Sequence, residues 1–287
     1  MALHVGIGLI TYNRKGVLRD TLELLRRNTV HPNTSLVVAD DGSTDGTRDM
    51  LDGLGVAYVT GDNGGVAWNK NRALFVLEEI AHSDVVILLE DDTAPTAYGW
   101  DTPWIKAAVR YGHMNVALEE TNEHYLGGSG TVADPIISTL ITAQCACFSR
   151  EALRFAGYFD PRFKGYGHEH VEHSIRMVRC GYGGHEQMVQ GRMKMVFKLL
   201  RSEFTLRPVK SFGSQEASDR NLALTQRIVV EQHYRAPWQD EAEMVRFRAE
   251  MRDAHARHPG GFPLQPEGYI IPPSEGRAPW FGMQLPP

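Results

Sequence analysis

Four apolar runs in the first third of the chain have the length and composition of buried β-strands. Each run is dominated by Val, Ile, Leu and Ala and lacks a polar face, as expected for parallel strands that are covered on both sides. The runs are Leu3–Thr11, Ser35–Ala39, Val56–Thr60 and Asp84–Leu89.

Helical patterns separate these runs. Apolar residues recur at intervals of three and four between Val17 and Leu25 and again between Val66 and Ala81. Strands that alternate with helices predict an α/β sheet with crossover connections. Because ligands bind at the carboxyl ends of the strands in such sheets, the polar segments TYNR, DDGS and EDD that follow three of the runs are expected to share one edge.

The pattern loosens after residue 100. A strand is expected over Gln144–Phe148, with helices over Arg150–Phe155 and Val171–Cys180. We expect a first domain over residues 1–205 and a C-terminal extension over residues 206–287. The extension has an amphipathic helix at about 238–258, with Phe247 and Met251 on its apolar face, and then a tail rich in Pro and Gly with aromatic residues.

The segment VVADDGSTDGT allows three interpretations. Asp41 to Asp52 places acidic and hydroxyl residues at several EF-hand positions, but a strand precedes the loop and Arg48 stands at an apolar position. A plain strand-to-helix turn, with Ser43 or Asp45 as the N-cap, is the simplest interpretation. It does not explain why Asp40 and Asp41 stand side by side after a buried strand, where two carboxylates need a donor, a cation or a ligand N–H.

A second acidic cluster, Glu90-Asp91-Asp92, follows five apolar residues directly. Three acids at the end of a buried strand are costly unless a cation neutralises them. Oxygen ligands suit Mg²⁺ or Mn²⁺, which also bind substrate phosphates. A nucleotide site with a divalent metal is therefore the sharper hypothesis, and a solvated acidic loop is the alternative.

Composition and charge narrow the classes of function. A net charge of −5 and a pI near 6.2 do not indicate the basic surface that tight binding to nucleic acid or anionic membranes requires. Three cysteines are a poor disulfide framework, no apolar run is long enough to span a bilayer, and the first residues lack the features of a signal peptide. We therefore expect a cytoplasmic protein.

Five segments in order resemble the GT-A glycosyltransferases of family 2, over roughly residues 4–185. They are ITYNR at 10–14, VVADDGSTDGT at 37–47, NGGVAWNKNRAL at 63–74, VVILLEDD at 85–92 and ACFSREALRFAGYFDPRFKGYGHEHVEHSIR at 146–176. The resemblance implies a GT-A (Rossmann-like) fold, with a mixed, mainly parallel sheet flanked by helices and followed by the C-terminal helical extension. It also implies hexosyl transfer (EC 2.4) from a nucleoside-diphosphate sugar to an acceptor hydroxyl.

The resemblance further implies roles for single residues in binding the donor. Asp41 would accept an N–H of the nucleobase, and Asp40 would support it. A UDP-sugar is the favoured donor, with GDP or dTDP as alternatives. The remaining residues of the donor site would be Thr11, Tyr12, Arg14, Lys70, Asn71 and Asp91.

Metal binding and catalysis would involve the two other motifs of the resemblance. Asp92, with Glu90, would coordinate Mn²⁺ or Mg²⁺ at the diphosphate. The base of an inverting reaction would come from Glu169 or His170, where the family usually has a Glu-Asp pair; we prefer Glu169. No histidine stands at the usual distance to complete the metal site, so Asp92, the diphosphate and water are expected to suffice.

Other functions stay open at this point. His168, His170 and His173 suggest zinc and a metal hydrolase, although their spacing fits neither HExxH nor HxxEH. The unusual GHEHVEH segment also allows a GT-A-like module that binds a nucleotide-sugar without turning it over. We expect residues 206–287 to shape the acceptor site or to form a homodimer contact, while the acceptor itself stays unknown.

Overall fold

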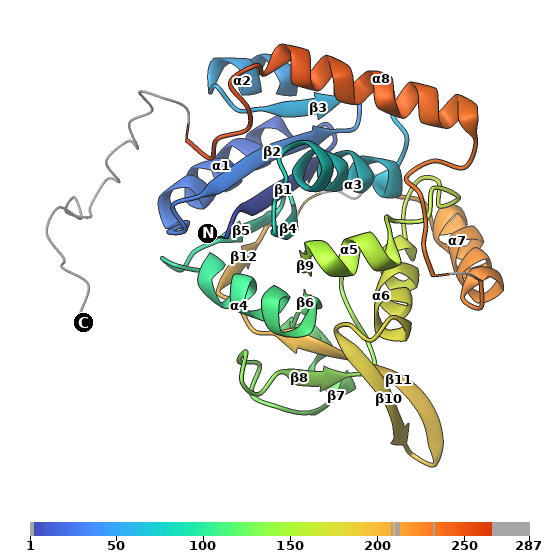
Figure 1. The fold of residues 1–287 in the computed structure, drawn as a ribbon. Coiled ribbons are helices and arrows are strands. Elements are labelled where there is room, and N and C mark those ends of the chain that lie inside the picture. Colours follow the sequence, from blue (N-terminus) through green and yellow to red (C-terminus); the bar gives the residue numbers. More distant parts are fainter. Residues whose placement is uncertain (1–2, 208, 210–212, 232, 266–287) are drawn as a thin grey trace, which may run out of the picture.

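The computed structural model describes residues 3–207, 209, 213–231 and 233–265, and Figure 1 shows a central sheet between two layers of helices. The N-terminal part of the sheet consists of β1 (Val5–Thr11), β2 (Thr34–Asp40), β3 (Tyr58–Thr60) and β4 (Val85–Glu90). These four strands pair in parallel in the order β3-β2-β1-β4. The predicted crossover sheet is thereby confirmed, with β3 beginning two residues later than expected.

The sheet continues through strands of mixed direction. β9 (Cys145–Ser149) runs antiparallel to β4 and to β6 (His113–Val116). Beyond them the order is β11 (Arg192–Leu200), β8 (Ile136–Ser138) and β7 (Tyr125–Gly127), and β10 (Gly184–Val189) forms a hairpin with β11. A small second sheet joins β5 (Thr93–Pro95) to β12 (Phe204–Leu206). A mixed sheet flanked by helices is confirmed, and the sequence patterns had indicated only β9 in this part.

Helices cover both faces of the sheet. One apolar core lies beneath α1 (Lys15–Asn28), α2 (Thr47–Gly53) and α4 (Asp101–Tyr111). The core on the other face takes side chains from α3 (Val66–Phe75), α5 (Arg150–Ala156), α6 (Glu169–Arg179), α7 (Gln215–Ile228) and α8 (Glu241–Arg257). A short π-helix at Val76–Ile80 (η1) and a 3₁₀-helix at Glu119–His124 (η2) complete the described elements.

The amphipathic helix of the extension is confirmed as α8 and begins at Glu241, because Asp240 caps it by accepting a bond from the amide of Glu243. Phe247, Met251 and Ala254 are buried in the core beneath α3. The apolar stripe therefore packs on the chain's own sheet domain. The division at residue 205 and the homodimer contact stay predictions, and residues 266–287 of the predicted tail lie outside the described residues.

Within the described ranges, no helix combines the length and apolar character that crossing a bilayer requires.

Candidate functional site

One cavity of about 260 Å³ opens at the carboxyl ends of β1, β2 and β4. It lies at the sheet edge where the sequence predicted a ligand. Six of the predicted donor and metal residues line it: Thr11, Tyr12, Arg14, Asp41, Glu90 and Asp91.

Asp40 and Asp41 each have the hydrogen-bond donors that adjacent buried carboxylates need. Asp40 is fully buried and accepts bonds from the hydroxyl of Thr60 (2.8 Å) and the amide of Ser43. Asp41 accepts from Nη1 of Arg72 (2.8 Å) and from the amides of Gly64 (2.9 Å) and Gly65 (3.0 Å). Burial raises the pKa of Asp41, and these donors oppose the rise. Asp40 thus supports the loop, and Asp41 faces the cavity.

The acidic cluster after β4 is partly neutralised by Arg14. Nη1 of Arg14 lies 2.9 Å from Oδ1 of Asp91 and 3.3 Å from Oδ2 of Asp92. Asp91 also accepts a bond from the hydroxyl of Thr11 at 2.7 Å. Burial raises the pKa of Asp91 to about 6, against the influence of Arg14.

Asp92 and Glu90 are the candidate residues for holding a cation. Burial and then the nearby charge of Glu90 raise the pKa of Asp92, so a cation between the two carboxylates would relieve their repulsion. Their oxygen atoms suit Mn²⁺ or Mg²⁺. Among the residues that the structure describes, no group of three His, Cys, Asp or Glu side chains is arranged to hold a metal. The remaining ligands of an ion on Glu90 and Asp92 would thus come from a substrate or from water.

Lys70 connects the acidic cluster to α6. Its ammonium is buried and lies 2.9 Å from Oε1 of Glu169 and 3.4 Å from Oε1 of Glu90. Burial alone would lower the pKa of Lys70, but the charges of Glu169 and Glu90 raise it. Lys70 is therefore a fixed cation between the two carboxylates and does not line the main cavity.

The structure places Asn71 away from the cavity. Its side chain is fully buried, and its amide group both donates to and accepts from the backbone of Phe159, at 2.9 Å in each case. Asn71 thereby fastens α3 to the segment that precedes α6.

Glu169 and His170 form the first turn of α6, two residues before the expected start of this helix. The helix follows a loop in which Gly165, Gly167 and His168 all have positive φ, and His168 adopts the left-handed conformation at the N-cap (φ 67°). Such backbone is costly for a non-glycine residue and is found where the surrounding structure imposes it. Nδ1 of His170 lies 3.5 Å from Oε1 of Glu169.

The electrostatics of the two base candidates differ. Burial alone would raise the pKa of Glu169, but Lys70 and then His170 lower it well below its usual range. A carboxylate held in this way is a weak base. His170 keeps about a fifth of its side chain exposed, whereas Glu169 is almost fully buried.

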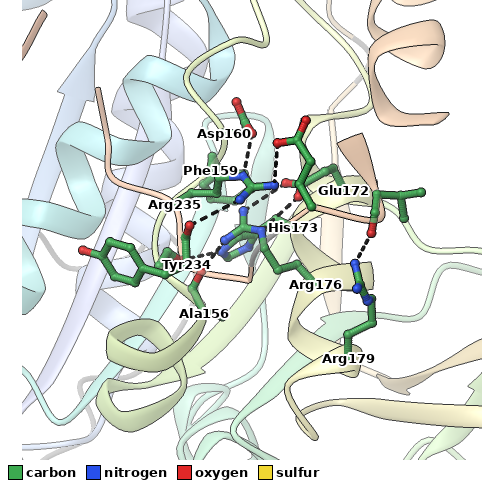
Figure 2. A network of polar contacts seen from close by, with 12 residues as sticks. Ala156, Phe159, Asp160, Glu172, His173, Arg176, Arg179, Tyr234 and Arg235 are labelled. Carbon is green, nitrogen blue, oxygen red and sulfur yellow. Dashed lines mark hydrogen bonds and ion pairs between the residues drawn. The ribbon is translucent and has the colours of Figure 1, made fainter. Parts of the chain in front are cut away.

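Figure 2 shows the polar network that joins α6 to the segment before it. Arg176 binds both carboxylate oxygens of Glu172 and donates to the carbonyl groups of Ala156 and Tyr158, while Arg235 pairs with Asp160 at 2.8 Å. These contacts fix the segment before α6 from two sides.

The three histidines of the zinc hypothesis do not form a common site. His173 is buried, its Nε2 is hydrogen-bonded to the carbonyl of Gly157 (3.0 Å), and burial keeps its pKa well below the usual value. His168 occupies the N-cap position of α6 without a side-chain capping bond, and Nδ1 of His170 lies 3.5 Å from Oε1 of Glu169. This arrangement gives the hydrolase hypothesis no structural support.

Several residues of the cavity were missed by the sequence analysis. Asn63, Val66 and Asn69 line it from the start of α3, and Tyr166 lines it from the loop before α6. Ser214 and Ala217, at the start of α7, belong to the C-terminal extension. The segment NGGVAWNKN offered a signal for the first group, whereas no local pattern indicated that α7 would reach the cavity.

The sequence and the fold were compared with those of known proteins. The sequence model described as Glycosyl transferase family 2 matches residues 7–125. No curated protein matches the chain by sequence. Among solved structures, GalNAc-T7 with UDP, GalNAc and Mn²⁺ aligns with a TM-score of 0.55 at 13% identity, over 88% of this chain and 55% of that one.

Two bacterial structures align similarly. TarS 1–349 of S. aureus in complex with UDP has a TM-score of 0.53 at 14% identity, over 89% of this chain and 72% of that one. Glucosyl-3-phosphoglycerate synthase from Mycobacterium tuberculosis with phosphoglyceric acid has a TM-score of 0.52 at 16% identity, over 80% and 81%. The chain spans only about half the length of GalNAc-T7. The chain shares the GT-A fold of these structures, and its residues 7–125 match the family 2 sequence model.

Proposed function

We propose that this chain is an inverting, metal-dependent glycosyltransferase that moves a hexosyl group from a nucleoside-diphosphate sugar to an acceptor hydroxyl. The observation that carries the proposal is the cavity in which Asp41, Asp91 and Glu90 converge from two strand ends. The family match and the GT-A fold support it.

The donor would bind with its base at Asp41 and its diphosphate toward Glu90 and Asp92. Asp41 is a buried acceptor that faces the cavity, as recognition of a base N–H requires. A UDP-sugar is the favoured donor, since UDP accompanies both GalNAc-T7 and TarS; GDP and dTDP sugars are the alternatives.

Glu90 and Asp92 would hold Mn²⁺ or Mg²⁺. When bound, this ion supplies positive charge to the diphosphate as its bond to the sugar breaks. Arg14, which already contacts Asp91 and Asp92, lines the same cavity and adds a second positive charge there.

We assign the base to His170 in preference to Glu169. The acceptor oxygen attacks the anomeric carbon, the bond from that carbon to the diphosphate breaks, and the hydroxyl proton moves to Nε2 of the imidazole. Glu169, whose pKa is lowered by Lys70 and His170 despite its burial, would orient Nδ1 and stabilise the imidazolium. The nucleoside diphosphate is the leaving group.

One observation favours the alternative of a binding module. Lys70 neutralises both Glu169 and Glu90, as expected for a site that holds carboxylates in place without using them as bases. Such a module would bind the nucleotide-sugar and release it unchanged.

Two variants decide between these functions. With His170→Ala we expect turnover to fall by about a hundredfold or more, the usual contribution of a general base, while nucleotide binding is retained. With Glu169→Gln we expect a smaller loss and a shifted pH profile of kcat. The exposed His185 provides the control His185→Gln. If His170→Ala releases nucleoside diphosphate as fast as the native protein does, His170 is not the base. If the native protein turns over no donor, the binding module is favoured.

A further inference from the structure

The carboxylate of Asp41 is bound by Arg72, whose guanidinium is fixed by several hydrogen bonds. Arg72 is fully buried, and its Nη1 donates to Asp41 (2.8 Å) and to Oδ1 of Asn69 (3.3 Å). Its Nη2 donates to the carbonyl of Asp62 at 2.8 Å. Arg72, in the last turn of α3, therefore joins this helix to the segments that follow β2 and β3.

The opposite edge of the guanidinium is bound by a residue of the C-terminal extension. Glu250 of α8 accepts from Nε of Arg72 at 2.9 Å and from Nη2 at 3.0 Å. It also accepts from the indole of Trp68 at 3.2 Å. Glu250 is 178 residues from Arg72 and lies outside the segment that matches the family model.

The chain is shaped to allow this contact. A Cβ atom at Gly61 would clash with the carboxylate of Glu250 and would approach Nη2 of Arg72. On α8, Phe247 packs edge-to-face on Trp68 with ring centroids 5.2 Å apart, one helical turn from Glu250. The apolar packing of Phe247 on Trp68 thus positions α8 so that Glu250 can bind Arg72.

The orientation of Arg72 determines what Asp41 can offer a ligand. With Nε and Nη2 engaged by Glu250, Nη1 is the atom of Arg72 that reaches Asp41, and Oδ2 of Asp41 accepts a bond from the amide of Gly65. A carboxylate oxygen accepts more than one bond, so Oδ2 retains capacity for a nucleobase N–H. Without Glu250, the guanidinium of Arg72 would rotate so that two of its N–H groups bind both carboxylate oxygens of Asp41.

We propose that Glu250 is a positioning residue for the donor, which acts through Arg72 to keep the Asp41 carboxylate available to the nucleobase. The inference rests on the proposed function. It assigns α8 a part in donor recognition, in addition to its part in the apolar core.

The test is calorimetric titration of Glu250→Gln with two probes, UDP and inorganic pyrophosphate, each with Mn²⁺. A Gln amide would turn an N–H₂ group toward the donors of Arg72 or Trp68, so the contact cannot be restored. We expect the affinity for UDP to fall by about tenfold, the scale of one hydrogen bond to a charged group, while pyrophosphate binds as before. The control is Glu241→Gln at an exposed position of the same helix.

A double-mutant cycle separates this role from a general loss of stability. In an Asp41→Asn background, Glu250→Gln should cause little further loss of UDP affinity, because both changes affect one interaction. If Glu250→Gln does not fold, Arg72→Lys replaces it, since a single ammonium cannot bridge Asp41 and Glu250 in the same way.

Three results would overturn the inference: UDP affinity of Glu250→Gln within about twofold of the native protein, equal losses for UDP and pyrophosphate, or additive effects in the cycle. These results leave the proposed function untouched, because binding of UDP by the native protein does not depend on a role of Glu250. If the native protein binds no nucleoside diphosphate at all, the proposed function fails and this inference fails with it.

Discussion

Several charged side chains at the site are paired with side chains from other elements. Asp91 pairs with Arg14, Asp41 with Arg72, and Lys70 bridges Glu90 and Glu169. A buried carboxylate without such a partner would be strongly destabilising. The sequence indicated that the acids after β2 and β4 need donors or cations, because each group follows a buried strand directly.

The identity of the partners was only partly predictable. Arg14 belongs to a recognised segment, but Arg72 and Glu250 look like ordinary charged residues on helices. Lys70 was expected at the donor, which stays a prediction, and its pairing with two carboxylates was not foreseen. Long-range pairing of this kind leaves no local pattern, since it depends on how α3, α6 and α8 meet.

At Gly65, substitution by Ala should weaken both the fold and the donor site. Gly65 has φ 86° and ψ 173°, and a Cβ atom would lie 2.6 Å from the backbone nitrogen of Gly165. Its amide also donates to Asp41. We expect Gly65→Ala to cost about 2 kcal/mol or more in the free energy of unfolding, measured by urea denaturation. The control Gly53→Ala meets no atom within 4 Å and should stay within about 1 kcal/mol, so equal stability of the two variants would contradict this account.

Among the secondary-structure elements, the strands that are buried on both faces were the ones that the sequence predicted. The strands β1, β2 and β4 are buried on both faces and gave clear apolar runs. The hairpin of β10 and β11 was missed, because its outer half is exposed on both faces and mixes Glu, Gln, Lys and Met. Its turn at Gln190-Gly191, where both residues have positive φ, was the one available signal.

Helix α8 should contribute strongly to stability through Phe247. This side chain is fully buried between Trp68, Phe75 and Trp238, with ring centroids 5.2 to 5.8 Å apart. We expect Phe247→Ala to lower the free energy of unfolding by about 3 kcal/mol or more. Val245, on the exposed face of the same helix, provides the control: Val245→Ala should change it by no more than about 0.5 kcal/mol. Similar midpoints in urea for the two variants would mean that α8 is not part of the core.

For the whole molecule, the parallel half of the sheet was predictable and the mixed half was not. In the first 90 residues β1, β2 and β3 pair with their neighbours in the sequence, and β4 pairs with β1 through a crossover. Alternating strand and helix patterns suffice to predict such a sheet. In contrast, β11 inserts between β6 and β8, and residues 263–264 run beside the start of β2. These pairings join segments far apart in the sequence, which periodicity does not reveal.

The whole chain should lose stability in mild acid because of two buried histidines. Burial lowers the pKa of His113 to about 4 and that of His173 well below its ordinary 6.5. Below pH 6.5 the unfolded chain binds protons that the folded chain does not, so stability falls as the pH drops toward 4, by up to about 1.4 kcal/mol per pH unit and histidine.

Urea denaturation at about pH 7 and about pH 5 measures this effect. We expect a clearly lower midpoint at the acidic pH, and a smaller difference for His113→Gln, which removes one of the two groups. Identical midpoints of the native protein at the two pH values would show that neither histidine is kept neutral by the fold.

The most direct test of the central claim is calorimetric titration of UDP, GDP and dTDP into the native protein, with Mn²⁺ and with EDTA, and into Asp92→Asn. We predict that one nucleotide binds with Mn²⁺, that EDTA abolishes this binding, and that Asp92→Asn weakens it by about tenfold or more, as expected for the loss of one carboxylate ligand. If none of the three nucleotides binds in the presence of Mn²⁺, the cavity formed by Asp41, Glu90 and Asp91 is not a donor site and the proposed function is wrong.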